Sequence, residues 1–396
     1  MDLRIAGARV SGESVIHFAA NRPLRRLVLR LWPNGPGQRA SLAVTRVTVN
    51  GKVARTSSSS PTMLVLALAR PAPAGRTIRI QLRWTLRLGS DALRMNAVGG
   101  FVRLGAFFPI LPWDERRGWV MDPPSPLAAE TYTSPSADFD VTIHAPAGLQ
   151  VVATGRQAHP GRWVARAVRD FAVAVGPFVE VSRTVDAPHP VHLTVAAPMG
   201  EQTTAEAFAD RATRALTALS ERFGPYPWPT LSIAVMPDLG RSGIEYPNLI
   251  FQGPVSLERA TTHEVAHQWF YSLVGNDQAR DPWLDEGLAN WAAMSIDHFE
   301  SIMSLPIPAA AQGRLGAPVS YWEQHPTDYF LGVYAQGPQA LASLGPPASV
   351  DCAVRNYIAA EAYRIAQPAD LVSALEAELP GATAKLAAYG VPTAPG

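Results

Sequence analysis

Apolar and polar positions alternate in short runs through the first half of the chain, with a period of two that is typical of half-buried strands. Turn-forming segments, such as PNGP at residues 33–36 and NG at residues 50–51, separate these runs. The runs fall at residues 27–31, 44–49, 63–68, 78–82, 139–143 and 149–153. This spacing predicts an N-terminal β domain, a sandwich or a curved, largely antiparallel sheet, that extends to residue 187.

The hydrophobic period changes from two to about 3.6 after Asp186. Residues 203–223 carry apolar side chains at helical spacing, and the Gly224-Pro225 pair would end that helix. Residues 231–236 then have the pattern of a buried strand, and the chain from Ala260 onward is mainly helical with Pro and Gly breaks. We therefore predict an α+β chain of two domains, residues 1–187 and residues 188–396.

Composition and charge exclude some classes of protein. The chain has 396 residues, of which 47% are hydrophobic and 17% charged, and this predicts a globular protein of about two domains. The formal net charge of +1 gives no electrostatic case for nucleic acid as a partner. Cys352 is the only cysteine, so the sequence excludes an intrachain disulfide and a cysteine-based metal cluster.

The sequence shows no pattern of a targeting or membrane segment. No apolar run near Met1 has the length of a signal peptide, and none elsewhere approaches the roughly 20 residues of a membrane helix. We expect a soluble chain with no integral membrane segment. The compartment, cytoplasmic or extracytoplasmic, and the oligomeric state stay open, because a signal or anchor can be removed from a longer precursor.

The segment HEVAH at residues 263–267 has the form H-E-x-x-H. Residues four apart on a helix differ by about 40° in azimuth, so the imidazoles of His263 and His267 project from one face and can clamp zinc. Glu264 lies beside this clamp and can hold a water molecule in the open position of the metal. An isolated H-E-x-x-H also occurs on ordinary helix faces, so the interpretation depends on a third ligand.

A catalytic zinc ion usually has three protein ligands and one open position. The segment WLDEGLANW at residues 283–291 supplies Glu286 after a Gly- and Pro-containing loop, which lets a second helix return antiparallel to the first. We favour Glu286 over Asp285 because Glu286 shares a helical face with Ala289 and Asn290. Asp285 is then available to orient a ligand imidazole from outside the coordination sphere. The pattern predicts one Zn²⁺ ion per chain.

Eighteen residues, 268–285, separate the H-E-x-x-H motif from Glu286. This arrangement resembles the aminopeptidase-N-like family of gluzincin zinc peptidases. Three other segments resemble that family as well: RFGPYP at 222–227, SGIEY at 242–246 in the place of G-x-M-E-N, and VYAQG at 333–337 in the place of Y-x-K-G. The resemblance implies a saddle-like β domain followed by a thermolysin-like, mainly helical catalytic domain. It also implies that the family's large helical C-terminal domain is missing.

The resemblance assigns roles to the residues at matching positions. Glu264 would be the general base, and Tyr334 would donate its phenol to the oxyanion. Glu245 would bind the free α-amine of a peptide or protein substrate. Gly243 and Ile244 would offer their backbone to the same substrate, as an edge strand can. Together these roles imply a zinc metallopeptidase, in particular an aminopeptidase.

Several positions depart from the family's pattern. Ser242, Tyr246 and Gln336 replace its usual Gly, Asn and Lys, and Gly99-Gly100 stand near the place of a second amine anchor. A single carboxylate holds an ammonium group less firmly than two acceptors do. Two alternatives therefore stay open: a zinc endopeptidase without a free-amine requirement, and a catalytically silent peptide-binding scaffold.

Overall fold

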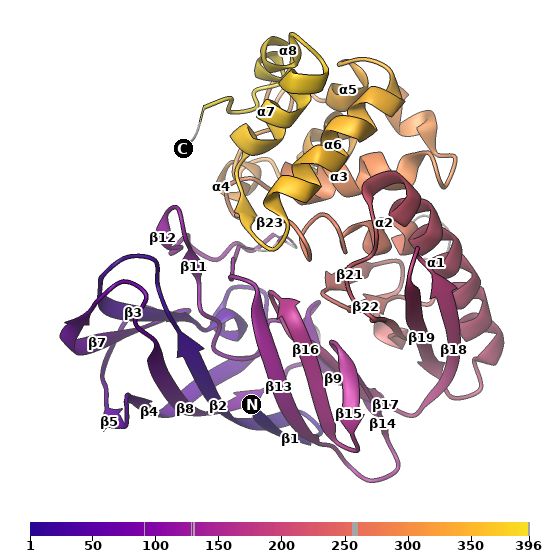
Figure 1. Ribbon diagram of the computed structural model, residues 1–396. Coiled ribbons are helices and arrows are strands. Elements are labelled where there is room, and N and C mark those ends of the chain that lie inside the picture. Colours follow the sequence, from indigo (N-terminus) through magenta and orange to yellow (C-terminus); the bar gives the residue numbers. More distant parts are fainter. Residues whose placement is uncertain (91, 128, 130, 256–259, 395–396) are drawn as a thin grey trace. The chain divides into compact units, whose positions relative to one another are not determined.

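The computed structural model describes residues 1–90, 92–127, 129, 131–255 and 260–394 (Figure 1). These residues form two compact units, Met1–Pro126 with Tyr132–Phe178 and Leu127–Thr131 with Val179–Gly396. The domain boundary that we propose from the sequence, at residue 187, falls at the end of strand β18 (Phe178–Asp186). Among the described residues, no helix combines the length and the apolar character that crossing a membrane requires.

The first unit is built from β-sheets, as the alternating pattern predicted (Figure 1). Its largest sheet has eight strands, whose neighbours are antiparallel except for one parallel pair, β1 with β13. In sheet order its strands are β15 (Arg156–His159), β16 (Arg162–Val168), β13 (Ala137–His144), β1 (Asp2–Ala6), β2 (Arg9–Phe18), β8 (Ile78–Arg87), β4 (Ser41–Val49) and β5 (Lys52–Val53).

Three smaller sheets and one short helix complete the first unit. The three-stranded sheet has the order β3 (Leu24–Arg30), β7 (Met63–Ala72) and β6 (Arg55–Ser60). The four-stranded sheet has the order β14 (Gln150–Ala153), β17 (Val173–Gly176), β10 (Phe101–Leu104) and β9 (Met95–Val98). β11 (Trp113–Asp114) pairs with β12 (Gly118–Trp119), and a 3-10 turn spans Trp32–Asn34.

Strand β8 shows how the sequence pattern builds the core of this unit. Its residues from Ile78 to Leu86 alternate between a buried and a more exposed face, which is the period of a pleated strand. The buried face includes Trp84, whose indole N–H donates to the hydroxyl of Ser14 at 3.0 Å. The neighbouring strand carries Gly12 at this point, and a Cβ there would lie 2.2 Å from the indole ring. The tryptophan therefore packs directly on the backbone of β2.

The second unit contains a five-stranded mixed sheet followed by helices (Figure 1). Its strands lie in the order β18 (Phe178–Asp186), β19 (Pro190–Pro198), β20 (Thr230–Val235), β22 (Leu249–Gln252) and β21 (Gly243–Tyr246). β19, β20 and β22 are parallel, whereas β21 runs antiparallel to β22 and ends the sheet. A small parallel pair joins β23 (Gly275–Asn276) to β24 (Ile365–Ala366).

The helices of this unit confirm the change of period that the sequence showed. They are α1 (Gln202–Phe223), α2 (Ala260–Ala266), α3 (Trp283–Met294), α4 (Val319–Trp322), α5 (Gln336–Ala342), α6 (Pro347–Glu361), α7 (Pro368–Glu378) and α8 (Ala382–Ala388). Two 3-10 turns, Pro237–Leu239 and Glu300–Ser304, and a π-helical segment, Phe330–Ala335, lie between them. The predicted helix 203–223 is α1, which ends where Gly224 adopts a positive φ of 101°. The predicted fold class, α+β with a β domain followed by a mainly helical one, is confirmed.

Helices α3 and α5 meet at a pair of glycines. A Cβ built on Gly337 would lie 2.7 Å from the Cα of Gly287, so the two backbones are in direct contact. A Cβ built on Gly287 would have no neighbour nearer than 3.4 Å. A side chain at Gly337 would therefore disrupt this contact, whereas a methyl group at Gly287 would be tolerated.

Replacing Gly337 by alanine should therefore force α5 away from α3. We expect Gly337→Ala to lower the free energy of unfolding by about 1–3 kcal/mol, the usual cost of overpacking. Gly287→Ala is the matched control, because both changes gain the same helix propensity. The midpoints of urea unfolding, followed by circular dichroism, measure the difference. Equal midpoints for the two variants would contradict the close backbone contact.

Candidate metal centre

The two histidines of the H-E-x-x-H motif lie close together at the end of α2. His263 is in the regular helix, and His267 continues it by one turn, since its backbone N–H donates to the carbonyl of His263 at 3.2 Å. Their Nε2 atoms are 3.0 Å apart. The helical spacing predicted from the sequence thus brings both imidazole edges to one point.

Glu286 reaches the same point from the first turn of α3. Its Oε2 lies 3.2 Å from the Nε2 of His263 and 3.4 Å from the Nε2 of His267. Ligand atoms at 2.0–2.1 Å from a tetrahedral zinc ion are separated by roughly 3.3 Å. The two imidazoles and the carboxylate therefore have both the chemistry and the mutual spacing of a set that could hold zinc.

A carbonyl group fixes the orientation of His267. Its Nδ1 lies 3.0 Å from the backbone oxygen of Phe270, and this contact assigns the proton to Nδ1 and leaves Nε2 as a ligand atom. Asp285, which the sequence suggested for such a role, instead accepts hydrogen bonds from Gln278 at 2.9 Å and from the backbone N–H of Glu286 at 2.8 Å. Sequence reasoning missed Phe270, because any residue can supply a carbonyl.

The site attracts positive charge. Burial acts to raise the pKa of Glu286, but the hydrogen bonds from His263 and His267 outweigh burial and lower that pKa well below its usual value. Burial acts to lower the pKa of His267, yet the charges of Glu245, Glu286 and Glu264 raise it well above its usual value. Without a metal ion, a proton would partly balance these carboxylates.

A second group of carboxylates lies beside the ligands. Ligand atoms of Glu245, Glu264 and His267 all fall within 4.8 Å of one another. Glu245 is on β21 and Glu264 on α2, and both are buried. The carboxylates of Glu264 and Glu245, which the sequence suggested as base and amine anchor, thus lie close to each other and to His267.

Gly243 permits the approach of β21 to α2. A Cβ on Gly243 would lie 2.3 Å from Oε1 of Glu264, so no other residue fits without moving that carboxylate. β21 pairs only with β22 among the described strands, so the other edge of Gly243 and Ile244 has no strand partner there. The sequence suggested the backbone role of this glycine, and the structure adds a steric reason for the residue.

Tyr334 lies in the π-helical segment and stacks on a metal ligand. Its ring centroid is 5.9 Å from that of His263, with 25° between the planes. Its carbonyl accepts a hydrogen bond from Nδ2 of Asn290 at 2.9 Å. Burial, followed by the charge of Glu286, raises the pKa of the Tyr334 phenol well above its usual value. The phenol is therefore protonated at neutral pH and can act as a donor.

Gln336, where the family has Lys, is a buried cross-link. Its Nε2 donates to the carbonyls of Ala311 and Gly332, both at 2.9 Å, and its Oε1 accepts from the N–H of Gly313 at 3.2 Å. Asn290 and Gln336 thus hold Tyr334 from α3 and from the segment around residue 312. The sequence signal for Asn290 was its position four residues after Glu286, on the same helical face.

Two other departures from the family's motifs, Tyr246 and the Gly99-Gly100 pair, have structural roles in the chain. Tyr246 is fully buried against Phe251, and its carbonyl accepts from Nε2 of Gln268 at 3.1 Å. Gly99 and Gly100 form the turn between β9 and β10 of the first unit, where both adopt a positive φ. Neither glycine can contribute a side-chain acceptor.

Comparisons with known proteins agree with this site. Residues 208–311 match the model of the peptidase family M1 domain. Aminopeptidase M1-C of Oryza sativa subsp. japonica is 34% identical over 91 residues, which are 19% of this chain and 10% of the rice protein. Aminopeptidase B of Homo sapiens is 36% identical over 99 residues, which are 23% of this chain and 15% of the human protein. The chain thus spans a small part of the length of these relatives.

Solved structures are similar over the whole chain. The M1 zinc metallopeptidase from Deinococcus radiodurans has a TM-score of 0.70 at 20% identity, covering 100% of this chain and 93% of the other. A two-domain M1 zinc metallopeptidase mutant solved with L-arginine has a TM-score of 0.72 at 21% identity, covering 100% and 94%. At these identities the likeness establishes the fold.

The chain thus has the fold of M1 zinc metallopeptidases, and its two histidines and glutamate form a group that could hold a metal ion. Residues 208–311, which contain the two histidines and the glutamate, match the model of the peptidase family M1 domain. The resemblance to the aminopeptidase-N-like gluzincins is thereby confirmed.

Removing the carboxylate of Glu286 should weaken metal binding strongly. We expect Glu286→Gln to lower zinc affinity by more than the roughly 10- to 100-fold that is typical for the loss of an outer hydrogen-bond partner. Asp285→Asn is the matched control, because burial and the charge of Glu286 raise the pKa of Asp285 to about 8, so that it is mostly uncharged at neutral pH. Zinc titration against a chromogenic chelator measures both. A larger loss of zinc affinity in Asp285→Asn than in Glu286→Gln would indicate that Asp285, and not Glu286, is the third ligand.

Proposed function

We propose that the chain is a zinc-dependent aminopeptidase that hydrolyses the first peptide bond of peptide substrates with zinc-activated water. His263, His267 and Glu286 would hold the metal. The observation that carries the proposal is the position of Glu245, whose carboxylate lies in one cluster with Glu264 and His267. A free α-amine bound there would present the first peptide bond to the base and the metal ligands.

The proposed chemistry needs no covalent intermediate. A zinc ion, when bound, lowers the pKa of its water and polarises the scissile carbonyl. Glu264 takes the proton of the attacking water and returns it to the leaving amine, a contribution of roughly 10²–10⁴-fold. Tyr334 donates its phenolic O–H to the carbonyl oxygen as negative charge develops there.

Substrate would bind along β21. Its backbone would pair with the free edge at Gly243 and Ile244, and its ammonium group would bind the buried carboxylate of Glu245. In agreement with such a mode, M1 zinc metallopeptidase mutants of similar fold have been solved with L-arginine and with a Tyr-Ser-Ala substrate. A peptide or protein substrate is therefore the proposed partner of this site.

One observation favours a second candidate, a zinc endopeptidase. The glycines at 99–100 supply no side chain where a second amine anchor would be expected, so the ammonium group would depend on Glu245 alone. An enzyme with this weaker anchor would also cleave peptides whose amine is blocked.

The base can be tested separately from the metal. We expect Glu264→Gln to lower kcat by at least roughly 100-fold, because the amide cannot accept the proton of the water. Zinc content, measured by atomic absorption, should stay at that of the unmodified protein. Glu221→Gln, an exposed glutamate on α1, is the control and should keep full activity. Unchanged turnover in Glu264→Gln would refute the assigned base.

The amine anchor can be tested with one peptide in two forms. A buried charge-assisted hydrogen bond contributes about 1.5–3 kcal/mol, so kcat/KM for the free-amine peptide should exceed that for its N-acetylated form by roughly 10- to 100-fold. Glu245→Gln should remove most of this difference by lowering kcat/KM for the free amine alone. Equal cleavage of both forms by the unmodified enzyme would favour the endopeptidase instead.

A further inference from the structure

The near-neutral charge of the chain conceals a strong separation of charge. Residues 1–178 contain 23 of the 34 Lys and Arg residues but 10 of the 33 Asp and Glu residues, and residues 179–396 contain the other 11 and 23. The β-sheet unit is therefore strongly basic and the metal-binding unit strongly acidic. Such a separation, unlike the net charge of +1, points to an electrostatic role for the first unit.

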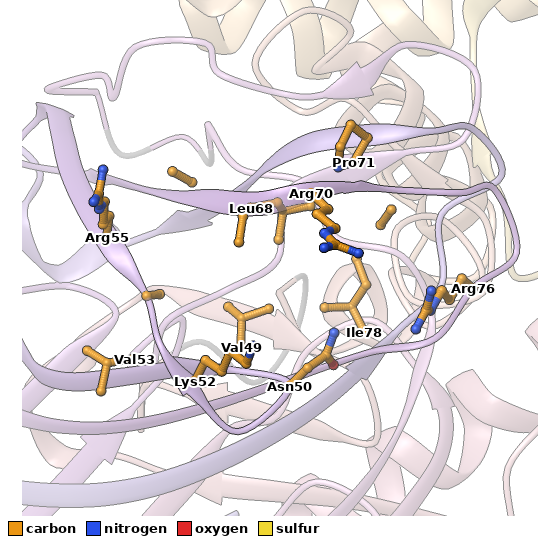
Figure 2. Close-up of a pocket in the computed structure, with 14 residues that line it drawn as sticks. Val49, Asn50, Lys52, Val53, Arg55, Leu68, Arg70, Pro71, Arg76 and Ile78 are labelled. Atoms are coloured by element: carbon orange, nitrogen blue, oxygen red, sulfur yellow. The ribbon is translucent and has the colours of Figure 1, made fainter.

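A cavity of about 900 Å³ lies within this basic unit, between strand β7 and the hairpin of β4 and β5 (Figure 2). Four cationic side chains line it: Lys52 on β5, Arg55 at the start of β6, Arg70 on β7, and Arg76 in the β7–β8 connection. No Asp or Glu lines the cavity among the residues that the structure describes.

The side chains of these four cationic residues have no partner within the described part of the chain. All of them are exposed, and their side chains make no hydrogen bond or ion pair with any described residue. Other exposed arginines of the same unit do have carboxylate partners, such as Arg83 with Glu13 and Arg162 with Asp140. The positive charges in the cavity are therefore accessible to an anion that is not part of the chain.

The floor of the cavity is aliphatic and its walls are strands. Val49, Leu68 and Ile78 contribute to the lining, and Figure 2 shows them between the strand that carries Arg70 and the hairpin that carries Lys52. β5 is the last strand of its sheet, and the pairing of β6 with β7 ends at Arg55 with Ala67. Main-chain groups of β7 beyond Ala67 thus have no partner in β6.

We propose that this cavity binds an extended acidic peptide, in which Asp or Glu residues alternate with small aliphatic ones. Its carboxylates would meet Lys52, Arg55, Arg70 and Arg76, and its aliphatic side chains would cover the floor. Single-stranded nucleic acid fits less well, because the described residues that line the cavity include no aromatic side chain on which a base could stack. The site is separate from the proposed peptidase function and does not depend on it.

The test uses the full chain and a fluorescein-labelled, N-acetylated ten-residue peptide that alternates acidic residues with Val. We expect salt-sensitive binding by fluorescence anisotropy, and a loss of roughly tenfold or more in affinity for the double variant Arg55→Glu and Arg70→Glu. The charge-matched control is Arg4→Glu with Arg156→Glu, two exposed arginines of the same unit outside the cavity. The affinity of the control variant for the peptide should fall by less than about threefold. Circular dichroism verifies that both variants fold.

Four outcomes would overturn the proposal. Equal losses in the cavity variant and the control would mean that diffuse charge binds the peptide. Absence of binding at about 1 mM peptide would mean that the cations only protect edge strands from unwanted pairing. Tighter cavity-dependent binding of a single-stranded oligonucleotide, or of phosphatidylserine vesicles, would identify another class of anion. Concentration-dependent self-association that the peptide disrupts would identify a second copy of this chain as the occupant.

Discussion

The repulsion among buried carboxylates is the interaction on which the second unit depends. Glu245, Glu264 and Glu286 all lie near the two histidines, in surroundings where like charges are costly. The same repulsion acts on Asp285, where burial and then the charge of Glu286 raise the pKa of the carboxyl. A divalent cation relieves this repulsion better than a proton on His267, because it interacts with several carboxylates at once. The charges of this cluster therefore favour the binding of a cation.

Close backbone contact makes this assembly of charges possible. The glycine at 243 lets an edge strand approach the carboxylate of Glu264, and the glycine at 337 lets α5 approach α3. A side chain at 243 would displace the carboxylate of Glu264, and a side chain at 337 would separate α5 from α3. Residues with no functional atoms therefore determine the distances on which the chemistry depends, and both glycines lie in motifs that the sequence singled out.

The sequence predicted what depends on local spacing and missed what depends on tertiary contact. The four-residue spacing of His263 and His267 determines their shared face on any helix, and the alternation in β8 determines its buried side. The Phe270 carbonyl lies only three residues from His267, but no residue type marks it, because every residue carries a carbonyl. Asn290 and Tyr334 are 44 residues apart, and only the fold brings them together. The charge separation is not visible in the net charge, because the excess of basic residues in the first part of the chain cancels the excess of acidic residues in the second.

Gln336 shows how a departure from a family motif can be compatible with the proposed site. A lysine has three donors and no acceptor, whereas a glutamine amide both donates and accepts. In this chain the N–H of Gly313 needs an acceptor, and the carbonyls of Ala311 and Gly332 need donors. One buried amide satisfies all three, which a lysine could not do without an uncompensated charge. The substitution therefore belongs to a local hydrogen-bond arrangement that holds the π-helical segment, and with it the phenol of Tyr334, beside His263.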